Sequence, residues 1–113
     1  MTIITDTLTL HELKKMAAQM FGNMVKAVVD VERELLAVDA ELHADLEARL
    51  LEDGSKQQSL WGINLYPELS GNELIEFDSM INMRPSQWNK SRGVENGELR
   101  GKITAIVAKK ITR

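Results

Sequence analysis

The chain has 113 residues, of which 43% are hydrophobic and 27% charged, and its formal net charge is −3 at pH 7. These proportions are typical of a soluble globular protein of one domain, which we expect to span residues 1–113. The lack of cysteine excludes disulfide bonds, thiolate nucleophiles and cysteine-ligated zinc. No apolar run is long enough to span a bilayer, and the N-terminus lacks the pattern of a secretory signal. We therefore expect a cytoplasmic protein that does not bind membranes.

The first predicted helix begins after Thr9. Glu12 follows three positions later, which completes a capping box, and residues 10–20 then carry a one-sided apolar stripe. Residues 24–33 alternate between apolar and polar side chains, as in a half-buried strand. Residues 35–40 are predicted to form its hairpin partner.

Residues 41–53 fit two patterns. Their apolar and polar residues alternate as in a strand, but alanine, leucine, glutamate and arginine favour a helix, and Gly54 supplies a stop. We predict a helix, on which His43 and Glu47 are neighbours one turn apart and Asp45 points away. On a strand, all three would share one face. The chain has only two histidines and no tight ligand motif, so we predict neither a metal site nor a cofactor.

Two further strands are predicted over residues 61–66 and 75–84, and a last helix begins near Asn96. The element order α-β-β-α-β-β-α predicts an α+β domain in which an antiparallel sheet packs against one layer of helices. The predicted core combines the apolar positions of these elements: Val29, Ile63, Phe77, Ile81, Leu99, Ile103 and Ile106.

Five segments of the chain resemble a family of small bacterial and archaeal proteins of unknown function. These segments read MVKAVVD, ELHAD, EDGSKQ, LWGINLYP and FDSMINMRPS, and they occupy residues 24–30, 41–45, 52–57, 60–67 and 77–86. The resemblance extends over nearly the whole chain. It implies a free-standing small prokaryotic protein, and it assigns no activity and no site residue.

Several polar side chains are predicted to share the side of the sheet that faces away from the core. Two of them are asparagines, which strands disfavour, and an amide group both donates and accepts hydrogen bonds. We therefore predict a ligand site, although an ordinary solvent-facing sheet or a polar dimer seam would explain the same pattern. The candidate ligand-binding residues, including those of the following loop, are Lys26, Asp30, His43, Asn64, Asp78, Asn82, Arg84, Asn89 and Arg92.

Arg84 is the predicted principal anion contact. It ends a predicted strand directly before Pro85, at a sheet-to-loop edge, and its guanidinium group can bind a phosphate or carboxylate in two places. In the alternative interpretation, Arg84 pairs with Asp78 or Glu76 and only holds the end of the strand.

The segment from Trp88 to Arg92 is basic and rich in amides. Lysine, arginine and backbone amides suit a phosphate, with Trp88 stacked on a base. A connecting loop that Trp88 docks onto the core is the simpler interpretation. Charge is also uneven along the chain: residues 1–83 carry a net charge of −9, and residues 84–113 carry +6. The acidic body disfavours generic duplex binding, so RNA has weaker support than a small anion.

The function predicted from these residues is a binding module, enzymatic or not, for a small anionic ligand on the polar sheet face. One alternative is an interaction protein whose polar face is an oligomer or partner surface. Another is a small metal-independent endoribonuclease of the toxin type. A pocket that contains both Arg84 and His43 would favour ligand chemistry. We also expect a homodimer, because the domain is small and the ends of the chain carry opposite charges.

Overall fold

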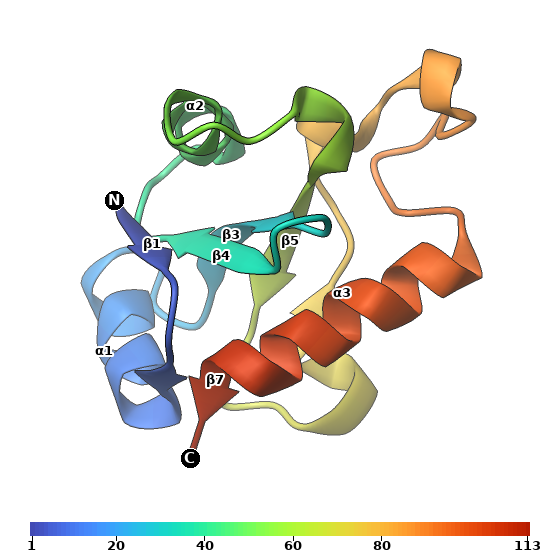
Figure 1. Ribbon diagram of the computed structural model, residues 1–113. Helices are drawn as coiled ribbons and strands as arrows, with labels where there is room; N and C mark the ends of the chain where they lie inside the picture. Colours follow the sequence, from blue (N-terminus) through green and yellow to red (C-terminus); the bar gives the residue numbers. More distant parts are fainter.

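Three helices and a five-stranded antiparallel sheet form the α+β domain in the computed structural model, which describes residues 1–113 (Figure 1). The sheet has the strand order β1-β4-β3-β5-β6, and β2 and β7 form a separate parallel pair. The strands are β1 Thr2–Ile4, β2 Leu8–Thr9, β3 Val25–Asp30, β4 Leu35–Val38, β5 Leu60–Leu65, β6 Ile75–Glu76 and β7 Ile111–Thr112. The helices are α1 Leu10–Gln19, α2 His43–Glu52 and α3 Gly97–Lys110. None of them is long and apolar enough to cross a membrane.

The sheet is covered on both faces. In Figure 1, α2 lies on one side of the sheet, and α1 and α3 lie on the other. The expectation of a single helix layer is wrong, because β3 has buried apolar side chains on both faces of the sheet. Its Val25 and Val29 belong to a cluster with α1 and α3, whereas Val28 packs against Leu46 and Leu50 of α2. Much of the face predicted to be polar is therefore buried under α2.

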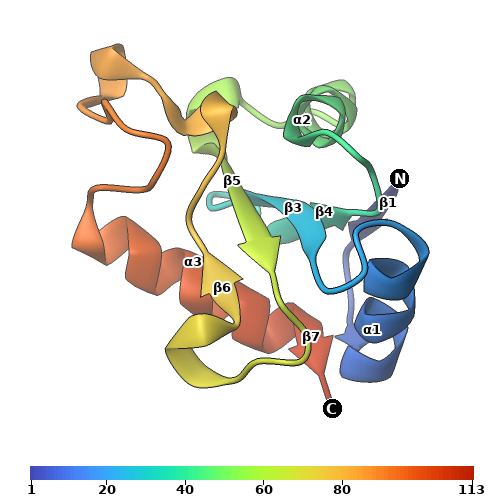
Figure 2. The ribbon, with the colours of Figure 1, turned by 180° about the vertical axis from the view of Figure 1, so that it is seen from behind.

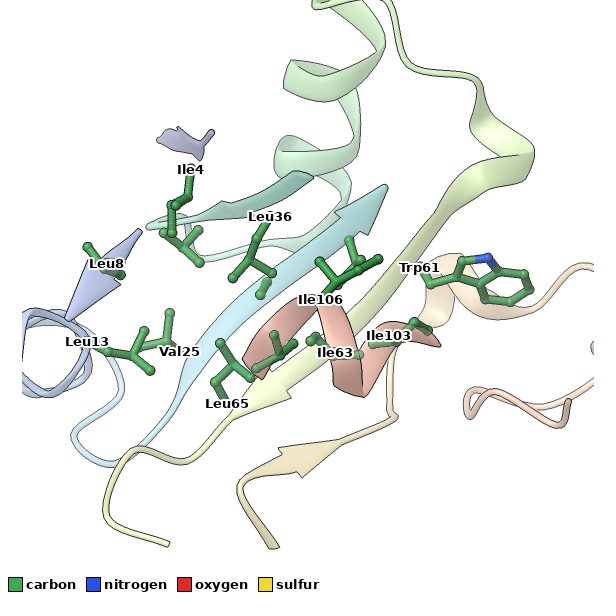
Figure 3. Packing of buried hydrophobic residues seen from close by; sticks show 14 of the residues in the cluster. Ile4, Leu8, Leu13, Val25, Leu36, Trp61, Ile63, Leu65, Ile103 and Ile106 are labelled. Carbon is green, nitrogen blue, oxygen red and sulfur yellow. The ribbon is translucent and has the colours of Figure 1, made fainter. Parts of the chain in front are cut away.

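The larger core cluster contains most of the predicted core. Val29, Ile63, Ile103 and Ile106 are buried in it. Figure 3 shows Ile63, Ile103 and Ile106 in this cluster. Phe77 and Leu99 pack against it. Ile81 is the exception, because it packs against the cluster under α2 on the opposite face of the sheet.

Local sequence signals place the helices as predicted. The Thr9 hydroxyl accepts a hydrogen bond from the Glu12 backbone N–H at 3.1 Å, and the Glu12 side chain accepts one from the Thr9 backbone N–H at 3.3 Å. This pair is the predicted capping box of α1. Residues 43–52 are helical rather than extended, and α2 buries His43, Leu46 and Leu50.

The strand predicted over residues 75–84 is wrong beyond Glu76. The chain leaves the strand conformation, and a 3-10 helix, Met80–Asn82, follows, capped by the Ser79 hydroxyl. Figure 2 shows this segment continuing alongside β5. The Asn82 side chain accepts a hydrogen bond from the Gly62 N–H at 2.8 Å and donates one to the Gly62 carbonyl at 2.9 Å. One amide side chain thus occupies the place of a paired strand. Arg84 Nη2 likewise donates to the Leu60 carbonyl.

Candidate functional site

Five of the nine predicted site residues lie together over β3, β5 and the segments that follow β6, beside the start of α2. We call this group the His43 cluster, and its members are Lys26, His43, Asn64, Asp78 and Arg92. It combines two cations, an imidazole, an amide and a carboxylate.

The strand register sets the base of the cluster. Lys26 of β3 pairs with Asn64 of β5, which pairs with Glu76 of β6, so the three residues form a row across the sheet. Asn64 Nδ2 donates to Glu76 Oε1 at 2.9 Å, and the Tyr66 hydroxyl donates to the same oxygen at 3.0 Å. The Asn64 carbonyl oxygen Oδ1 is buried without a partner. Burial lowers the pKa of His43 and the Asn64 side chain raises it, so the row meets the histidine at this residue.

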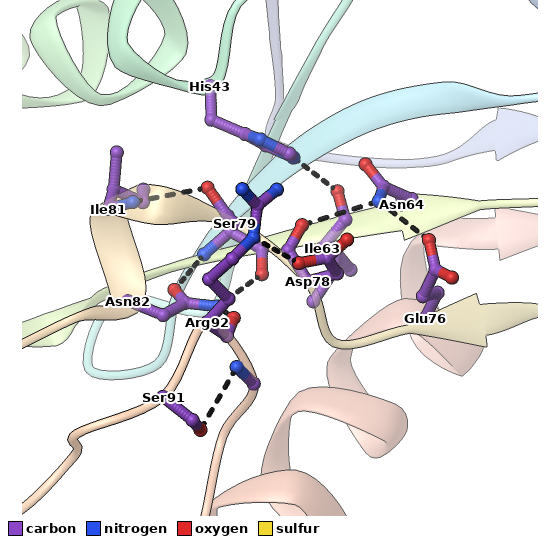
Figure 4. Close-up of polar contacts among 12 residues, drawn as sticks. His43, Ile63, Asn64, Glu76, Asp78, Ser79, Ile81, Asn82, Ser91 and Arg92 are labelled. Atoms are coloured by element: carbon purple, nitrogen blue, oxygen red, sulfur yellow. Dashed lines mark hydrogen bonds and ion pairs between the residues drawn. The ribbon is translucent and has the colours of Figure 1, made fainter.

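His43 is the first residue of α2 and is buried. Its Nε2 lies 2.8 Å from the Ile63 carbonyl oxygen, which only accepts, so Nε2 carries the proton (Figure 4). Burial lowers the pKa of His43 below its ordinary value, and the hydrogen bond to Ile63 partly opposes that shift. Lys26 lowers the pKa further, and Asp78 raises it. The Asn64 side chain also raises the pKa of His43. Burial is the largest of these effects, so His43 is neutral at neutral pH, with its proton on Nε2.

Arg92 and Asp78 form an ion pair beside the histidine. Arg92 Nε donates to Asp78 Oδ1 at 2.6 Å, and the side chains are 54% and 42% exposed. In Figure 4, the guanidinium group points toward the side of the sheet on which His43 lies. Its two Nη groups have no protein partner, so they are free to donate to a ligand.

Three other predicted residues have hydrogen bonds within the protein. Asp30 accepts from the backbone N–H groups of Glu32 and Arg33, both at 2.9 Å, and so holds the β3–β4 turn. Asn82 bridges to β5, as described above. Asn89 Nδ2 donates to three nearby backbone carbonyls. Asp30, Asn82 and Asn89 are each at most 3% exposed. Their side chains therefore stabilise the fold and are not accessible to a ligand.

Arg84 docks its loop onto β5. Its two Nη groups donate to the Leu60 carbonyl and, at 2.5 Å, to the Gln57 carbonyl, and its guanidinium lies 4.0 Å from the centre of the Trp61 ring. Burial lowers the pKa of Arg84, and Glu47 opposes that shift. Arg84 forms an ion pair with neither predicted partner. None of three cavities on the protein is lined by Arg84 or His43, so none of them is the shared pocket that would favour ligand chemistry at these two residues.

Trp88 does not dock onto the core, so that interpretation is wrong. The side chain is 84% exposed, whereas Trp61 is 3% exposed and packs inside. The two tryptophans border a cavity of about 500 Å³, which we call the tryptophan pocket, and it is also lined by Gln58, Gln87, Asn96 and Leu99. Sequence patterns do not reveal these amide residues, because Gln58 precedes β5 and Asn96 caps α3, and only the path of the chain between them brings the two together.

The acidic residues of α2 do not form a metal site with His43. Asp45 is exposed on a different side of the helix, as the helical spacing predicts. No group of three histidine, aspartate or glutamate side chains in the chain is close enough to hold a metal ion.

A family model described as a protein of unknown function, DUF5674, matches residues 2–110 of the chain. This match confirms the resemblance of the five segments to a family without an assigned activity. No curated protein and no solved structure is significantly similar to the chain.

Proposed function

We propose that this protein, which belongs to the DUF5674 family over residues 2–110, is a binding module for a small anionic ligand. The ligand is held at the His43 cluster. The observation that carries this proposal is that Arg92 has two unpaired Nη groups on the side of the sheet where His43 and Lys26 lie. A guanidinium group with two free donors suits a phosphate or carboxylate.

The carboxylate of the cluster, Asp78, and the neighbouring carboxylate of Glu76 both accept hydrogen bonds within the protein. Asp78 binds Arg92 through Nε only, which orients the guanidinium and leaves its other donors free. Glu76 accepts hydrogen bonds from Asn64 and Tyr66. Lys26 has no carboxylate within 4 Å, and its ammonium group lies 5.2 Å from the centre of the Phe21 ring. The donors that remain free in the cluster are therefore cationic.

The start of α2 adds positive charge at the same place. The N-cap residue Leu42 provides no side-chain hydrogen bond, so the first N–H groups of α2 have no side-chain cap. The partial positive charge of a helix N-terminus favours anions within its first turn. An anion that binds there also raises the pKa of His43, so we expect tighter binding as the pH falls toward 6.

Inorganic phosphate is the probe that tests this proposal. Phosphate should raise the melting temperature above that measured in chloride of equal ionic strength, and a ligand at ~100 times its dissociation constant adds about 2.7 kcal/mol. Arg92→Gln should remove the effect. Lys102→Gln, which neutralises an exposed cation of α3, is the matched control and should retain it. Equal phosphate stabilisation of wild type and Arg92→Gln would contradict the proposal.

The same cluster supports RNA cleavage without a metal as a second candidate function. The neutral His43 offers Nδ1 as a base for a ribose 2′-hydroxyl, and Arg92 and Lys26 are cations that stabilise charge on the phosphate oxygens. The 2′-oxygen then bonds to the adjacent phosphorus as the bond to the 5′-oxygen breaks. The products are a 2′,3′-cyclic phosphate and a 5′-hydroxyl that takes its proton from water, and His43 returns its proton to the solvent. Single-stranded RNA should then be cleaved in the presence of a chelator. His43→Gln keeps a donor for the Ile63 carbonyl but lacks the base, so it should be inactive. Cleavage at the wild-type rate by this variant would assign the activity to a contaminant.

A further inference from the structure

Trp88 is held in an unusual position. Its backbone is in the left-handed region, with φ of 61°, which costs a bulky residue of the order of 1 kcal/mol or more. Its indole is 84% exposed, although the chain has only five aromatic residues. An exposed aromatic side chain in a strained conformation contributes nothing to the core. A contact with a ligand would account for both its exposure and its strained backbone.

The loop that presents Trp88 is firmly anchored. Arg84 and Asn89 close the loop through two backbone hydrogen bonds of 2.7 and 3.2 Å. Beneath it, Arg84 stacks on Trp61, and Gln87 Nε2 donates to the Gln58 carbonyl at 3.0 Å. The backbone that carries the indole is therefore pre-positioned, so a ligand does not have to order the loop on binding.

The tryptophan pocket beside this indole has a size suited to a small molecule. Its volume of about 500 Å³ lies within the common range for ligand sites. Three amides on its wall have free polar groups: the Gln58 side chain, Gln87 Oε1 and Asn96 Nδ2 have no partner in the protein. Glu95 also lines the pocket, and its Oε2 accepts from the backbone N–H groups of Lys90 and Ser91, at 2.7 and 2.9 Å, while its Oε1 has no partner. The pocket thus offers an aromatic face, amide donors and acceptors, and one carboxylate oxygen that accepts hydrogen bonds.

We propose that the tryptophan pocket binds a nucleobase. The base stacks on Trp88, and the amides of Gln58, Gln87 and Asn96 bind its polar edge. Every base has a π-face that stacks on an indole, and base edges mix donors with acceptors as amides do. The base comes either from a free nucleotide or from single-stranded RNA. This site shares no residue with the His43 cluster, so it stands or falls independently of the proposed function.

NMR of the two indole N–H groups tests the proposal. Nucleoside monophosphates should shift the Trp88 signal, and ribose 5-phosphate, which lacks a base, should not. Trp88→Ala should weaken binding about five- to 150-fold, since stacking on an aromatic residue is worth ~1–3 kcal/mol per base. Trp88→Phe should retain part of the affinity. Met83→Ala removes an exposed side chain from the same segment, 47% exposed, and should change nothing.

Each outcome has a defined meaning. Binding of a short single-stranded RNA but not of mononucleotides supports the site and assigns the base to RNA. Equal shifts with ribose 5-phosphate, or undiminished affinity in Trp88→Ala, would overturn the proposal. Self-association that disappears in Trp88→Ala, without any nucleotide binding, would also overturn it and assign the indole to an interface. Arg92→Gln should leave nucleobase binding intact even if it abolishes phosphate binding at the His43 cluster.

Discussion

Asn82→Ala tests whether one side chain completes the sheet. Asn82 is fully buried, and its amide binds both backbone groups of Gly62 at 2.8 and 2.9 Å. It also donates to the Arg92 carbonyl at 2.9 Å, which has a second partner in the Ser79 N–H. The variant therefore leaves the N–H and the carbonyl of Gly62 unpaired in the interior.

The expected loss of stability follows from those two groups. A buried polar group without a partner costs about 1–3 kcal/mol, so we expect Asn82→Ala to lose about 2–6 kcal/mol. That is a large share of the roughly 5–15 kcal/mol by which a domain is stable. Relaxation is limited because Ser79 packs directly against Gly62: a Cβ placed on this glycine would lie 2.5 Å from the Ser79 Cβ.

Equilibrium unfolding in urea measures this loss. Asn72→Ala removes an exposed asparagine from a surface turn and serves as the control, with an expected change under about 0.5 kcal/mol. Asn82→Asp keeps the acceptor for the Gly62 N–H and loses both donors, so it should also be strongly destabilised. A loss below about 0.5 kcal/mol for Asn82→Ala would refute the view that this amide replaces a strand.

Four further predictions concern the core, the titration of His43, the fork of Arg84 and the oligomeric state. Ile103→Ala should lower the free energy of unfolding by about 2–5 kcal/mol in urea, because Ile103 is fully buried; a loss under 0.5 kcal/mol would refute its place in the core. His43 has a folded pKa below its ordinary value of 6.5, so the unfolded chain takes up the proton first. Stability should hold above pH 6.5 and fall as the pH drops from there through the folded pKa; thermal unfolding across this range should show a flatter profile for His43→Gln. In Arg84→Lys, the single ammonium group cannot reproduce the two-pronged donation of the guanidinium group to the Gln57 and Leu60 carbonyls. Urea unfolding should show a loss of about 1–3 kcal/mol of stability, while phosphate binding stays unchanged. Light scattering over a range of concentrations should give the mass of a homodimer, and a monomer mass at high micromolar concentration would rule the dimer out.

Periodicity and capping predicted the elements whose stability is local. The Thr9–Glu12 capping box marked α1, alternation marked β3, and the leucine spacing of residues 42–50 selected a helix for α2. The burial of both sheet faces could not be predicted in this way. Val28 lies between Lys26 and Asp30, so the residues on its side of β3 looked polar, and only packing against α2 shows that this valine is core.

Asparagine in a strand-like segment was the most misleading signal. We interpreted Asn82 as a ligand contact because strands disfavour asparagine, and its amide instead pairs with the backbone of β5. Arg84 has a similar role through its fork. Of the candidate cluster, Lys26 and Asn64 were placed on one face correctly by alternation. Arg92 comes close to the His43 side of the sheet because of the path of residues 77–92. This segment has no helical or strand-like hydrophobic period, so the sequence alone does not predict its path.

Along the first half of β5, side chains rather than a neighbouring strand bind the backbone groups of the outer edge. This arrangement affects the tendency of the protein to aggregate at high concentration. Free backbone groups on a sheet edge are a template on which another chain can add a strand, which is a common start of aggregation. Asn82 occupies both groups of Gly62, and Arg84 occupies the carbonyl of Leu60. An incoming strand therefore finds no open partner on this stretch. We therefore expect these two side chains to block intermolecular β-pairing, a role that is separate from their contribution to folding and from ligand binding.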